Sequence, residues 1–581
     1  MYILILNIKT LIPFSNIILK CNYMNFLVGR DLKGIKLRPQ QKKCLKQIFN
    51  KIDNVEDKNK FFILDLPPGV GKSILAMSFI YHYLKRFPDA QFDMLTETKI
   101  LQEQYRQEFS SISNLWGKNT YECSSFGVSC EKGARLAALT NSKCENCPYT
   151  KDREQFMKGK VSLTNFHMHT VLNINDLLDE RRAEILIVDE AHSLERSVTE
   201  YVGMNISEGL LESFGIKKGK KILEDLYKFE TVQDYYNNIK TLTDILSSKL
   251  TEYNNELQHH TQGNKTATYR DLTLNTVLGE ESDILKYAKY TEELNKFFYK
   301  VNNFIADYQE NKDNWSLDKT KDEEGNIRIA VEPIWVGNFM KSLIWDKYEM
   351  VILMSATFLS KEMTCFLNGI ENNESVYYSI DSPFPVKNRP IYFMDIGKMS
   401  YNQKEKTFEK SSKILQKILN KYKNEKGIVH TTNYELSSWI QNRIIDNRLL
   451  YHDNTLESKN SVLDMHYNQD NPSVIVSPSM VTGVDLKNER ARFQVLMKVP
   501  YPSLASNRNK KRMQSNKDWY GWATVTNIIQ AYGRAIRSVD DYANFIILDS
   551  CFNDVITYSG KFLPKWVTDA IVIVEKEKIK V

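Results

Sequence analysis

The sequence predicts an α/β fold with two parallel-sheet domains. Short apolar runs end in polar or small residues, and continuous runs of this length suit strands that are buried on both faces of a parallel sheet. Helical stretches separate these runs, so the pattern is one of repeated βα units. The runs are FFIL before Asp65, EILIV before Asp189, MVILM before Ser355, GIVH at 427–430, SVIV before Ser477, FQVLM at 493–497 and NFIIL before Asp549.

Two segments interrupt this pattern. Residues 111–165 contain a cluster of four cysteines, and residues 205–330 show helical periodicity without a buried-strand signal. Within the second segment, QHHTQGNKTATYRD and KTKDEEGNIR are expected to be exposed loops. The expected organisation is an apolar N-terminal extension at 1–23, a first core at 24–110, 166–204 and 331–372, a cysteine domain at 111–165, a mainly helical domain at 205–330, and a second core at 373–581.

The composition is that of an ordinary globular protein. The chain has 581 residues, of which 42% are hydrophobic and 26% charged, so it can bury a large core without disulfides. A net charge of +6 permits a nucleic-acid partner without requiring one. The cysteines outside the cluster are scattered singly, which argues against a secreted disulfide framework and favours an intracellular location, cytoplasmic in a bacterial or viral setting or nuclear in a eukaryote.

The apolar N-terminal extension has two possible interpretations. Lys9 and Lys20 interrupt it, so no run reaches the roughly 18 apolar residues that span a bilayer. No basic segment precedes it, as a signal peptide would require. We expect either a packed strand or an upstream start with Met24 as the working initiator, and no membrane partner.

The segment FFILDLPPGVGKSILAM reads as a strand, a tight loop and a helix. Gly69 and Gly71 would let backbone amides face phosphate oxygens, and Lys72 would reach the β- and γ-phosphates. The Ser73 hydroxyl would join a Mg²⁺ shell, although Leu66 stands where the strict pattern has its first glycine. The predicted ATP-binding loop therefore consists of Pro68, Gly69, Val70, Gly71, Lys72 and Ser73.

A carboxylate pair follows another predicted strand, in ILIVDEAHSLE. Asp189 at the strand end would hold Mg²⁺, and Glu190 would orient or deprotonate the attacking water. An Asp-Glu pair alone is commonly a solvated turn. After a buried strand and downstream of a phosphate loop, we favour the catalytic interpretation.

The segment NIIQAYGRAIRS places polar groups on one helix face. Gln530, Gly533, Arg534 and Arg537 fall at i, i+3, i+4 and i+7. The two arginines either form a solvated stripe or point across a cleft at the γ-phosphate, where they would stabilise charge that develops during phosphoryl transfer. We favour the second interpretation.

Other segments give weaker signals. In LRPQQKKCLKQI (37–48), Gln40 or Gln41 would read the adenine edge, unless the segment is simply a helix start near Pro39. His167 and His169 are either metal ligands or, as we favour, residues at a strand end that lines a cleft. The stretch NRNKKRMQSNKDWYGW either tracks a nucleic-acid strand or is an exposed loop that leads into a helix with buried tryptophans; its basic and aromatic residues are Arg508, Lys510, Lys511, Arg512, Trp519, Tyr520 and Trp522.

Taken together, the motifs resemble those of superfamily 2 helicases, and most closely the group of the XPD (Rad3) repair helicase and bacterial DinG. The resemblance runs in order from about residue 35 to 552. LPPGVGKS resembles motif I, TETKILQEQ (96–104) motif Ia, DEAH (189–192) motif II, VILMSAT motif III, IVHTTNYEL motif IV, SPSMVTGVDL motif V and QAYGRAIR motif VI.

The resemblance implies two RecA-like motor domains with ATP and Mg²⁺ between them. His192, Ser355, Ala356 and Thr357 would couple hydrolysis to strand movement, and Gly483 and Asp485 of the motif V segment would contact the nucleotide. Contacts to nucleic acid are expected from Thr98, Gln104 and Thr431, and from Lys511 and Arg512 of the basic stretch.

The cysteine cluster has the spacing C-x6-C-x13-C-x2-C, formed by Cys123, Cys130, Cys144 and Cys147. Four thiolates can hold either zinc or a cubane cluster, and the C-x2-C pair does not decide between them. The position between motifs Ia and II resembles that of the [4Fe–4S] domain of XPD-like helicases, and CPYTKDR (147–153) resembles a stretch of that domain. The spacing differs from that of the family, so zinc remains the alternative.

The expected function is that of a monomeric ATP-dependent DNA helicase. By resemblance, it would move 5′ to 3′ on single-stranded DNA that passes between the cysteine domain and a helical arch (205–330), and it would unwind forked duplex DNA. The alternatives are a remodelling or binding protein that does not unwind, an RNA-directed helicase, and a P-loop enzyme that is not a motor, such as a kinase.

Overall fold

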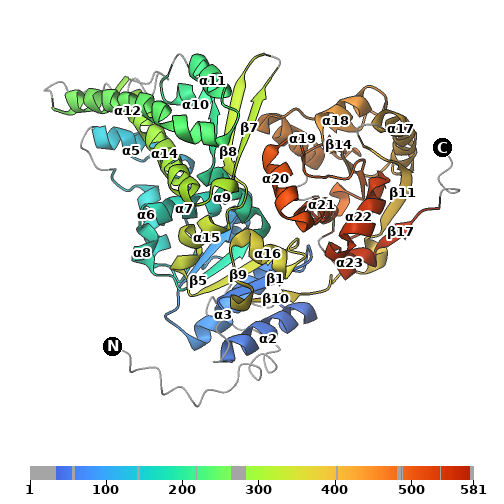
Figure 1. Cartoon of the computed structure of the whole chain (residues 1–581). Coiled ribbons are helices and arrows are strands. Elements are labelled where there is room, and N and C mark those ends of the chain that lie inside the picture. Colours follow the sequence, from blue (N-terminus) through green and yellow to red (C-terminus); the bar gives the residue numbers. More distant parts are fainter. Residues whose placement is uncertain are drawn as a thin grey trace.

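The computed structural model contains two lobes, which Figure 1 shows side by side. The first lobe holds residues up to Ser379 and the second lobe begins with the strand at Ile391. The predicted extension at 1–23 and the predicted site residues Gly483, Asp485 and Arg537 lie outside the described residues. The structure describes residues 35–54, 59–139, 144–216, 219–262, 283–322, 324–400, 403–479, 486, 488–536, 538 and 540–575.

The first lobe is built on a seven-stranded parallel sheet in the order β10-β1-β9-β5-β2-β4-β3. Every residue of β1, β2 and β5 is buried, as continuous apolar runs predict. Three predicted runs are β1, β5 and β9. The strands are β1 (Phe61–Asp65), β2 (Phe92–Thr96), β3 (Ser113–Asn114), β4 (Val161–Asn165), β5 (Ile185–Asp189), β9 (Met350–Ser355) and β10 (Ser375–Ser379).

Helices surround this sheet and position the loops at its carboxyl edge (Figure 1). Strand β10 lies beyond the predicted boundary at 373, yet it pairs with β1 and so extends the first sheet. The helices of the core are α2 (Pro39–Asp53), α3 (Lys72–Arg86), α4 (Lys99–Glu108), α7 (Phe166–Ile174), α8 (Leu177–Arg181), α9 (Leu194–Val202), α15 (Gly337–Leu343) and α16 (Lys361–Asn368).

The second lobe repeats the architecture, with a parallel sheet in the order β13-β14-β12-β15-β16-β11-β17. The four remaining predicted runs are β12, β14, β15 and β16. Its strands are β11 (Ile391–Gly397), β12 (Gly427–His430), β13 (Leu449–Tyr451), β14 (Val474–Ser477), β15 (Phe493–Leu496), β16 (Asn544–Asp549) and β17 (Ile571–Ile573). Its helices are α17 (Lys404–Lys421), α18 (Tyr434–Gln441), α19 (Leu456–Asn468), α20 (Asn507–Ser515), α21 (Lys517–Tyr532), α22 (Cys551–Ser559) and α23 (Lys565–Thr568).

The two insertions project from the first lobe. The cysteine segment contains α5 (Cys130–Leu139) and α6 (Pro148–Lys158), packed around a small apolar core. The arch contains two long helices, α12 (Val232–Gln262) and α14 (Asp283–Glu310), which lie at the upper left of Figure 1. Two shorter helices, α10 (Glu208–Ser213) and α11 (Gly219–Tyr227), precede them.

The arch also contains strands that the sequence analysis did not predict. An antiparallel sheet has the order β6-β8-β7, from β6 (Met204–Ser207), β7 (Trp315–Lys321) and β8 (Ile327–Pro333). Of the expected loop KTKDEEGNIR (319–328), residues 319–321 belong to strand β7 and residues 327–328 to strand β8. Strand β8 buries alternate side chains, which is the pattern of a sheet with one buried face, so the continuous apolar run that marks a parallel strand is missing.

Helix α20 of the second lobe begins against strand β7 of the first. The carboxylate of Asp318 accepts hydrogen bonds from the backbone amides of Asn507 at 2.6 Å and Arg508 at 3.4 Å, and from the Ser506 hydroxyl at 3.0 Å. The first amides of a helix have no partner within it, and a carboxylate at that end is favourable. Asp318 therefore caps a helix that belongs to the other lobe.

Two arginines of α20 then pair with Glu195 of α9. Arg508 Nη2 lies 3.0 Å from Glu195 Oε1, Arg512 Nη2 contacts the same oxygen, and these side chains are only 5–15% exposed. The Arg512 guanidinium also stacks between the rings of Trp335 and Trp519, at 4.7 and 5.3 Å from their centroids. We call this contact of α20 with Glu195 and Asp318 the interlobe clasp.

The clasp changes the interpretation of the basic stretch before α21. Lys511 Nζ donates to the carbonyl of Trp315 at 2.8 Å, and Arg512 is buried, so the structure gives both predicted nucleic-acid contacts protein partners. Trp519 and Trp522 are buried, in agreement with the alternative of buried tryptophans, but the residues before them form helix α20 and not an exposed loop.

Among the helices that the structure describes, none has the length and apolarity to cross a membrane.

We predict that Glu195→Gln destabilises the protein at neutral pH. Removal of one partner from a buried ion pair leaves the arginine charges uncompensated, at a cost on the order of 3 kcal/mol. Burial alone would raise the pKa of Glu195, but Arg512 and Arg508 lower it to about 2, from an ordinary value of 4.5. The contribution is therefore complete above about pH 4.5 and is lost as the pH falls through about 2. Thermal melting at pH 7 should show a first transition several degrees lower.

Glu200→Gln is the matched control for this prediction. Glu200 pairs with Arg196 on the same helix, but the two side chains are 61% and 75% exposed. An exposed pair of this kind contributes roughly 0.3–0.5 kcal/mol. Equal melting curves for the two variants at pH 7 would show that the clasp does not stabilise the fold.

Candidate nucleotide-binding site

Two side chains at the start of helix α2 donate hydrogen bonds to the loop between β1 and α3. Gly69 and Gly71 have φ values of +72° and +84°, which favour glycine. Arg38 Nη1 donates to the Gly69 carbonyl at 2.6 Å. Gln41 Nε2 donates to the carbonyls of Val70 and Gly71, at 2.9 and 3.1 Å. Of the two glutamines considered for adenine, Gln41 thus supports the loop, and the residues that line the adjacent cavity include Arg38 but not Gln40.

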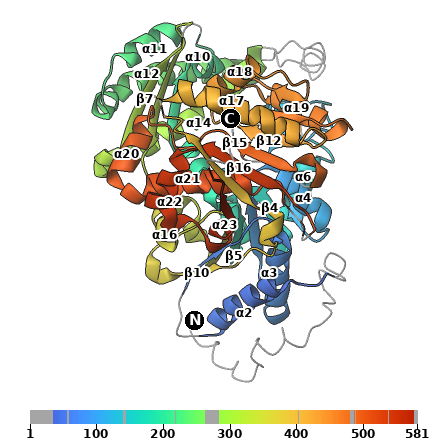
Figure 2. The same ribbon diagram turned by 90° about the vertical axis from the view of Figure 1, so that its right-hand side faces the viewer.

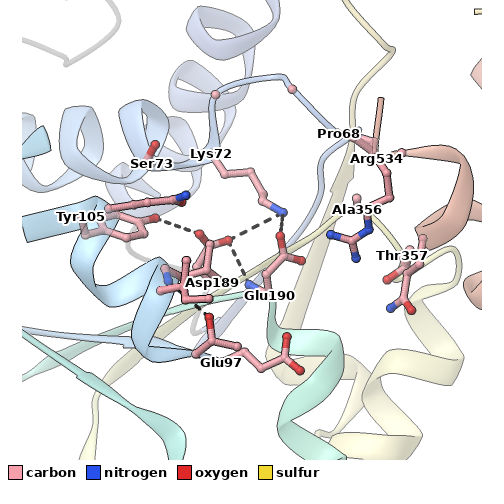
Figure 3. A pocket seen from close by; sticks show the side chains of 18 of the residues that line it. Pro68, Lys72, Ser73, Glu97, Tyr105, Asp189, Glu190, Ala356, Thr357 and Arg534 are labelled. Atoms are coloured by element: carbon pink, nitrogen blue, oxygen red, sulfur yellow. Dashed lines mark hydrogen bonds and ion pairs between the residues drawn. The ribbon is translucent and has the colours of Figure 1, made fainter. Parts of the chain in front are cut away.

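Lys72 opens helix α3 and faces the carboxylates at the end of β5 (Figure 3). Its ammonium group pairs with Glu190 Oε1 and lies 3.8 Å from Asp189 Oδ1. The backbone amide of Glu190 donates to Asp189 Oδ1 at 2.9 Å, and Glu190 has a φ of +51°. Strand end, turn and helix start therefore bring the predicted lysine and both carboxylates together.

The charges at this point are strongly coupled. Burial would raise the pKa of Glu190, but Lys72, His192 and Arg534 together lower it to about 2. Burial raises the pKa of Asp189, although Lys72 opposes the shift. Glu190 is therefore ionised at neutral pH, which is the form that can accept a proton from water or orient it.

The DEAH turn is connected to the end of β9. His192 Nδ1 and Ser355 Oγ lie 2.8 Å apart, and Ser355 Oγ accepts from the Thr357 amide at 3.1 Å. Burial lowers the pKa of His192 to about 4, so the ring is neutral at pH 7. Ala356 and Thr357 line the cavity, so the predicted coupling residues form one contiguous connection beside it.

A cavity of about 930 Å³ lies between the lobes. The first lobe contributes loop residues Pro68, Gly69, Gly71, Lys72 and Ser73 together with Asp189, Glu190 and His192, and the second lobe contributes Gln530, Gly533 and Arg534. Arg534 and Glu190 line the same cavity, and the positive charge of Arg534 also lowers the pKa of Glu190. Figure 3 shows Arg534 facing the phosphate loop.

The structure also places the remaining predicted residues that it describes. Thr98 and Gln104, predicted from resemblance to contact nucleic acid, line this same cavity. Thr431 is buried, and its hydroxyl lies 2.6 Å from Ser437 Oγ. Val70 is buried beneath the loop. His169 is also buried, with Nε2 2.7 Å from the Tyr348 hydroxyl.

Sequence reasoning missed Tyr105, Arg38 and a group on the second lobe. Tyr105 lines the cavity and donates to Asp189 Oδ2 at 3.0 Å. The second lobe adds Asn460, Leu463, Asp464 and Tyr467 from α19, and Arg490, whose guanidinium lies 4.2 Å from the Tyr467 ring centroid. No local motif marks these residues, because their partners lie far away in the sequence.

The oxygen groups in the cavity suit Mg²⁺. Asp189 supplies a carboxylate and Ser73 a hydroxyl, and hard oxygen donors together with phosphate oxygens are the usual Mg²⁺ ligands in proteins. Ser73 Oγ makes only a long contact of 3.5 Å, to Glu108 Oε2. The predicted donors therefore fit the ion.

The four clustered cysteines form two pairs. Cys123 Sγ and Cys144 Sγ lie 3.6 Å apart, and Cys147 contributes to the raised pKa of Cys130. Burial raises the pKa of Cys130 to about 12 and that of Cys144 to about 11. Among the described residues, no group of three or more potential ligands is already arranged as a metal site. The set of thiols fits a thiolate-bound metal in its chemistry, and two pairs within one small domain bring them near each other.

Comparison with known proteins agrees with this geometry. Residues 34–242 match the family model for the res subunit of type III restriction enzymes, and residues 402–570 match the model for the helicase C-terminal domain. A probable ATP-dependent helicase of Methanocaldococcus jannaschii is 21% identical over 89% of this chain and 92% of its own. The ATP-dependent DNA helicase DinG of Photobacterium profundum is 23% identical over 70% of this chain and 67% of its own.

Solved structures show the same fold. An XPD helicase matches with a TM-score of 0.62 at 16% identity and covers 93% of this chain and 100% of its own. Xpd4 of S. tokodaii matches with a TM-score of 0.53 at 15% identity, with the same coverage. In sequence this chain is similar to ATP-dependent helicases, and in fold it is similar to XPD helicases. Its two parallel sheets have a RecA-like arrangement.

We predict that Gly69→Ala weakens nucleotide binding at least ten-fold. An added Cβ would come within 2.5 Å of the Phe384 ring, and a left-handed φ costs an L-residue about 1–2 kcal/mol. The loop would have to shift away from its phosphate-facing conformation. The measurement is a titration with a fluorescent ATP analogue.

Gly117→Ala serves as the control, because Gly117 has a φ of −65° and an added Cβ would meet only Asn119 Oδ1, at 3.4 Å. We expect its nucleotide affinity to equal that of the parent protein. Unchanged affinity in Gly69→Ala would mean that this loop does not hold the phosphates.

Proposed function

We propose that this chain hydrolyses ATP in the cavity between its lobes to move along single-stranded DNA and to unwind duplex DNA. The observation that supports this most is the composition of the cavity wall. The phosphate loop and the DEAH turn come from one RecA-like lobe, and Arg534 comes from the other. Because the catalytic residues come from both lobes, the site is assembled only when the two lobes close on the nucleotide. Closure and opening of the lobes can therefore couple ATP hydrolysis to movement along a strand.

The residues have distinct roles in this proposal. Lys72 and the amides of the loop hold the triphosphate, Asp189 and Ser73 hold Mg²⁺, and Glu190 orients or deprotonates the attacking water. When bound, Mg²⁺ supplies neutralisation of the phosphate charge. Arg534 stabilises the charge that develops on the transferred group, with Gln530 beside it. Arg537, Gly483 and Asp485 remain predicted contributors outside the described residues.

DNA is proposed as the substrate because relatives named as DNA helicases cover most of the chain. Movement from 5′ to 3′, a forked duplex as substrate and a monomeric state follow from the family resemblance. Strand displacement on a 5′-tailed DNA duplex tests the proposal. ATP hydrolysis stimulated by single strands without displacement would favour a remodelling protein, and stimulation by RNA in place of DNA would favour an RNA-directed helicase.

The cysteine domain is proposed to hold a [4Fe–4S] cluster through Cys123, Cys130, Cys144 and Cys147, with zinc as the alternative. The support is the set of four thiols in two pairs and the position of the domain between motifs Ia and II. A bound metal would cross-link and stabilise this domain, whose own apolar core is small. A reducing, intracellular setting is part of this proposal, because the ligands must be reduced thiols.

We predict that Arg534→Ala lowers ATP turnover about a thousand-fold, because an arginine at the transferred phosphoryl group contributes at least this much in related chemistry. Steady-state phosphate release with saturating single-stranded DNA is the measurement. Nucleotide affinity should change much less, because Arg534 acts mainly on charge that develops during the reaction.

Arg443→Ala is the control, since Arg443 is an exposed arginine of the same lobe that lies over Trp439. Its turnover should match that of the parent protein. Undiminished turnover in Arg534→Ala would contradict the motor interpretation and favour a P-loop enzyme without a second motor lobe.

We predict that anaerobically purified protein contains iron and acid-labile sulfide in equal amounts, and that Cys147→Ser loses both. Cys365→Ser should retain them, because Cys365 is buried in the first lobe beside Ser375 Oγ, outside the cysteine domain. A colourless protein that contains zinc and no iron would contradict the cluster and support zinc as the bound metal. If Cys147→Ser has the same metal content as the parent protein, the proposal that these cysteines bind a metal is wrong.

A further inference from the structure

Tyr105 places a hydroxyl group on the carboxylate at the end of β5. Its side chain comes from α4, is 3% exposed, and donates to Asp189 Oδ2 at 3.0 Å (Figure 3). The ring lines the cavity between the lobes. A buried tyrosine normally satisfies its hydroxyl group, and here the acceptor is the carboxylate that faces the phosphate loop.

The other oxygen of Asp189 has its own partners. Oδ1 accepts from the Glu190 amide at 2.9 Å and lies 3.8 Å from Lys72 Nζ. Both oxygens are therefore held, one from the DEAH turn and one from α4. A buried carboxylate that loses one such donor must rotate or recruit water, because an unsatisfied polar group costs about 1–3 kcal/mol.

Helix α4 is itself firmly placed, so it can define the position of the tyrosine hydroxyl. The Thr98 side chain accepts from the Leu101 amide at 3.3 Å and caps the helix. Gln102 Nε2 donates to the Leu115 carbonyl at 2.9 Å and to Asn114 Oδ1 at 2.7 Å. The first bond satisfies an amide at the start of α4, and the other two attach Gln102 of this helix to residues 114 and 115.

We infer that Tyr105 is a positioning residue, which fixes the rotamer of Asp189 so that the carboxylate presents one geometry to the Mg²⁺ of a bound nucleotide. This inference rests on the proposed nucleotide function of the cavity. Residues that hydrogen bond to a metal ligand hold the ligand in place, and their loss typically costs ten- to a hundred-fold in metal affinity.

The same kind of contact occurs elsewhere in the same sheet and provides a matched control. The Tyr348 hydroxyl donates to Asp93 Oδ2 at 2.8 Å, and Asp93 lies near the start of β2, where it also pairs with Arg181. Both residues are buried, and neither belongs to the cavity wall. Tyr348→Phe thus removes a similar hydrogen bond from a carboxylate that the inference does not involve, together with the contact of the same hydroxyl with His169.

The test measures binding of a fluorescent, non-hydrolysable ATP analogue as a function of Mg²⁺ concentration. We expect Tyr105→Phe to raise the half-saturating Mg²⁺ concentration ten-fold or more while its affinity in the presence of EDTA stays that of the parent protein. Tyr348→Phe should leave both values unchanged. Chelation of Mg²⁺ by the analogue is common to all three proteins, so the difference between them reports on the protein.

Two outcomes would overturn the inference. An unshifted Mg²⁺ requirement in Tyr105→Phe would show that Asp189 does not need the hydroxyl. An equal loss of binding with and without Mg²⁺ would show that Tyr105 supports the fold of the cavity and not the metal ligand. If the parent protein binds no analogue under any condition, the proposed nucleotide function fails, which is a different result from either.

Discussion

The relation between the two lobes depends on one buried carboxylate. Glu195 lies between Arg508 and Arg512 of the opposite lobe, and all three side chains are largely withdrawn from water. Two buried guanidinium groups without a counterion would be strongly unfavourable, so the helix that carries them has one place to dock. Asp318 adds a second constraint, because it satisfies the amides at the start of the same helix.

The clasp is connected directly to the catalytic turn. Glu195 is the second residue of α9, and the DEAH turn with Asp189 and Glu190 immediately precedes that helix. A movement of the turn therefore acts on α9 and on the arginines of α20 that pair with it. Any rotation of one lobe against the other must either break these charged contacts or turn about them, and turning is the less costly course.

The sequence predicted the parts of the fold whose signals are local. Strands β1, β5 and β9 were visible as apolar runs because both faces of a parallel sheet are buried. The sheet β6-β8-β7 was not, because strand β8 buries only alternate side chains, and because the sequence of β7, WSLDKTK, resembles a polar loop. The phosphate loop and carboxylates were predictable for a similar reason, since close backbone approach and charge each demand particular residues at fixed spacing.

The remaining site residues depend on pairs that are distant in the chain. Tyr105 and Asp189 are 84 residues apart, and Asp318 and Asn507 are 189 apart, so no window of sequence contains either pair. Composition alone favours nucleic-acid binding by Lys511 and Arg512. A basic and aromatic stretch, however, has the same residue types whether it binds a nucleic-acid strand or packs against a neighbouring lobe. Which of the two occurs depends on acceptors such as Glu195, and only the folded structure brings Glu195 next to these basic residues.

The glycines beside the cavity serve the lobes as well as the ligand. An added Cβ on Gly69 would meet Phe384, and one on Gly533 would come within 2.5 Å of Pro68 Cγ. The phosphate loop thus touches the segment that carries Arg534 without an intervening side chain. Because Gly533 leaves no space for a side chain between itself and Pro68, a shift of the loop would act directly on the second lobe at the site itself. The clasp holds the lobes together at one point, and this contact joins them at a second point beside the cavity.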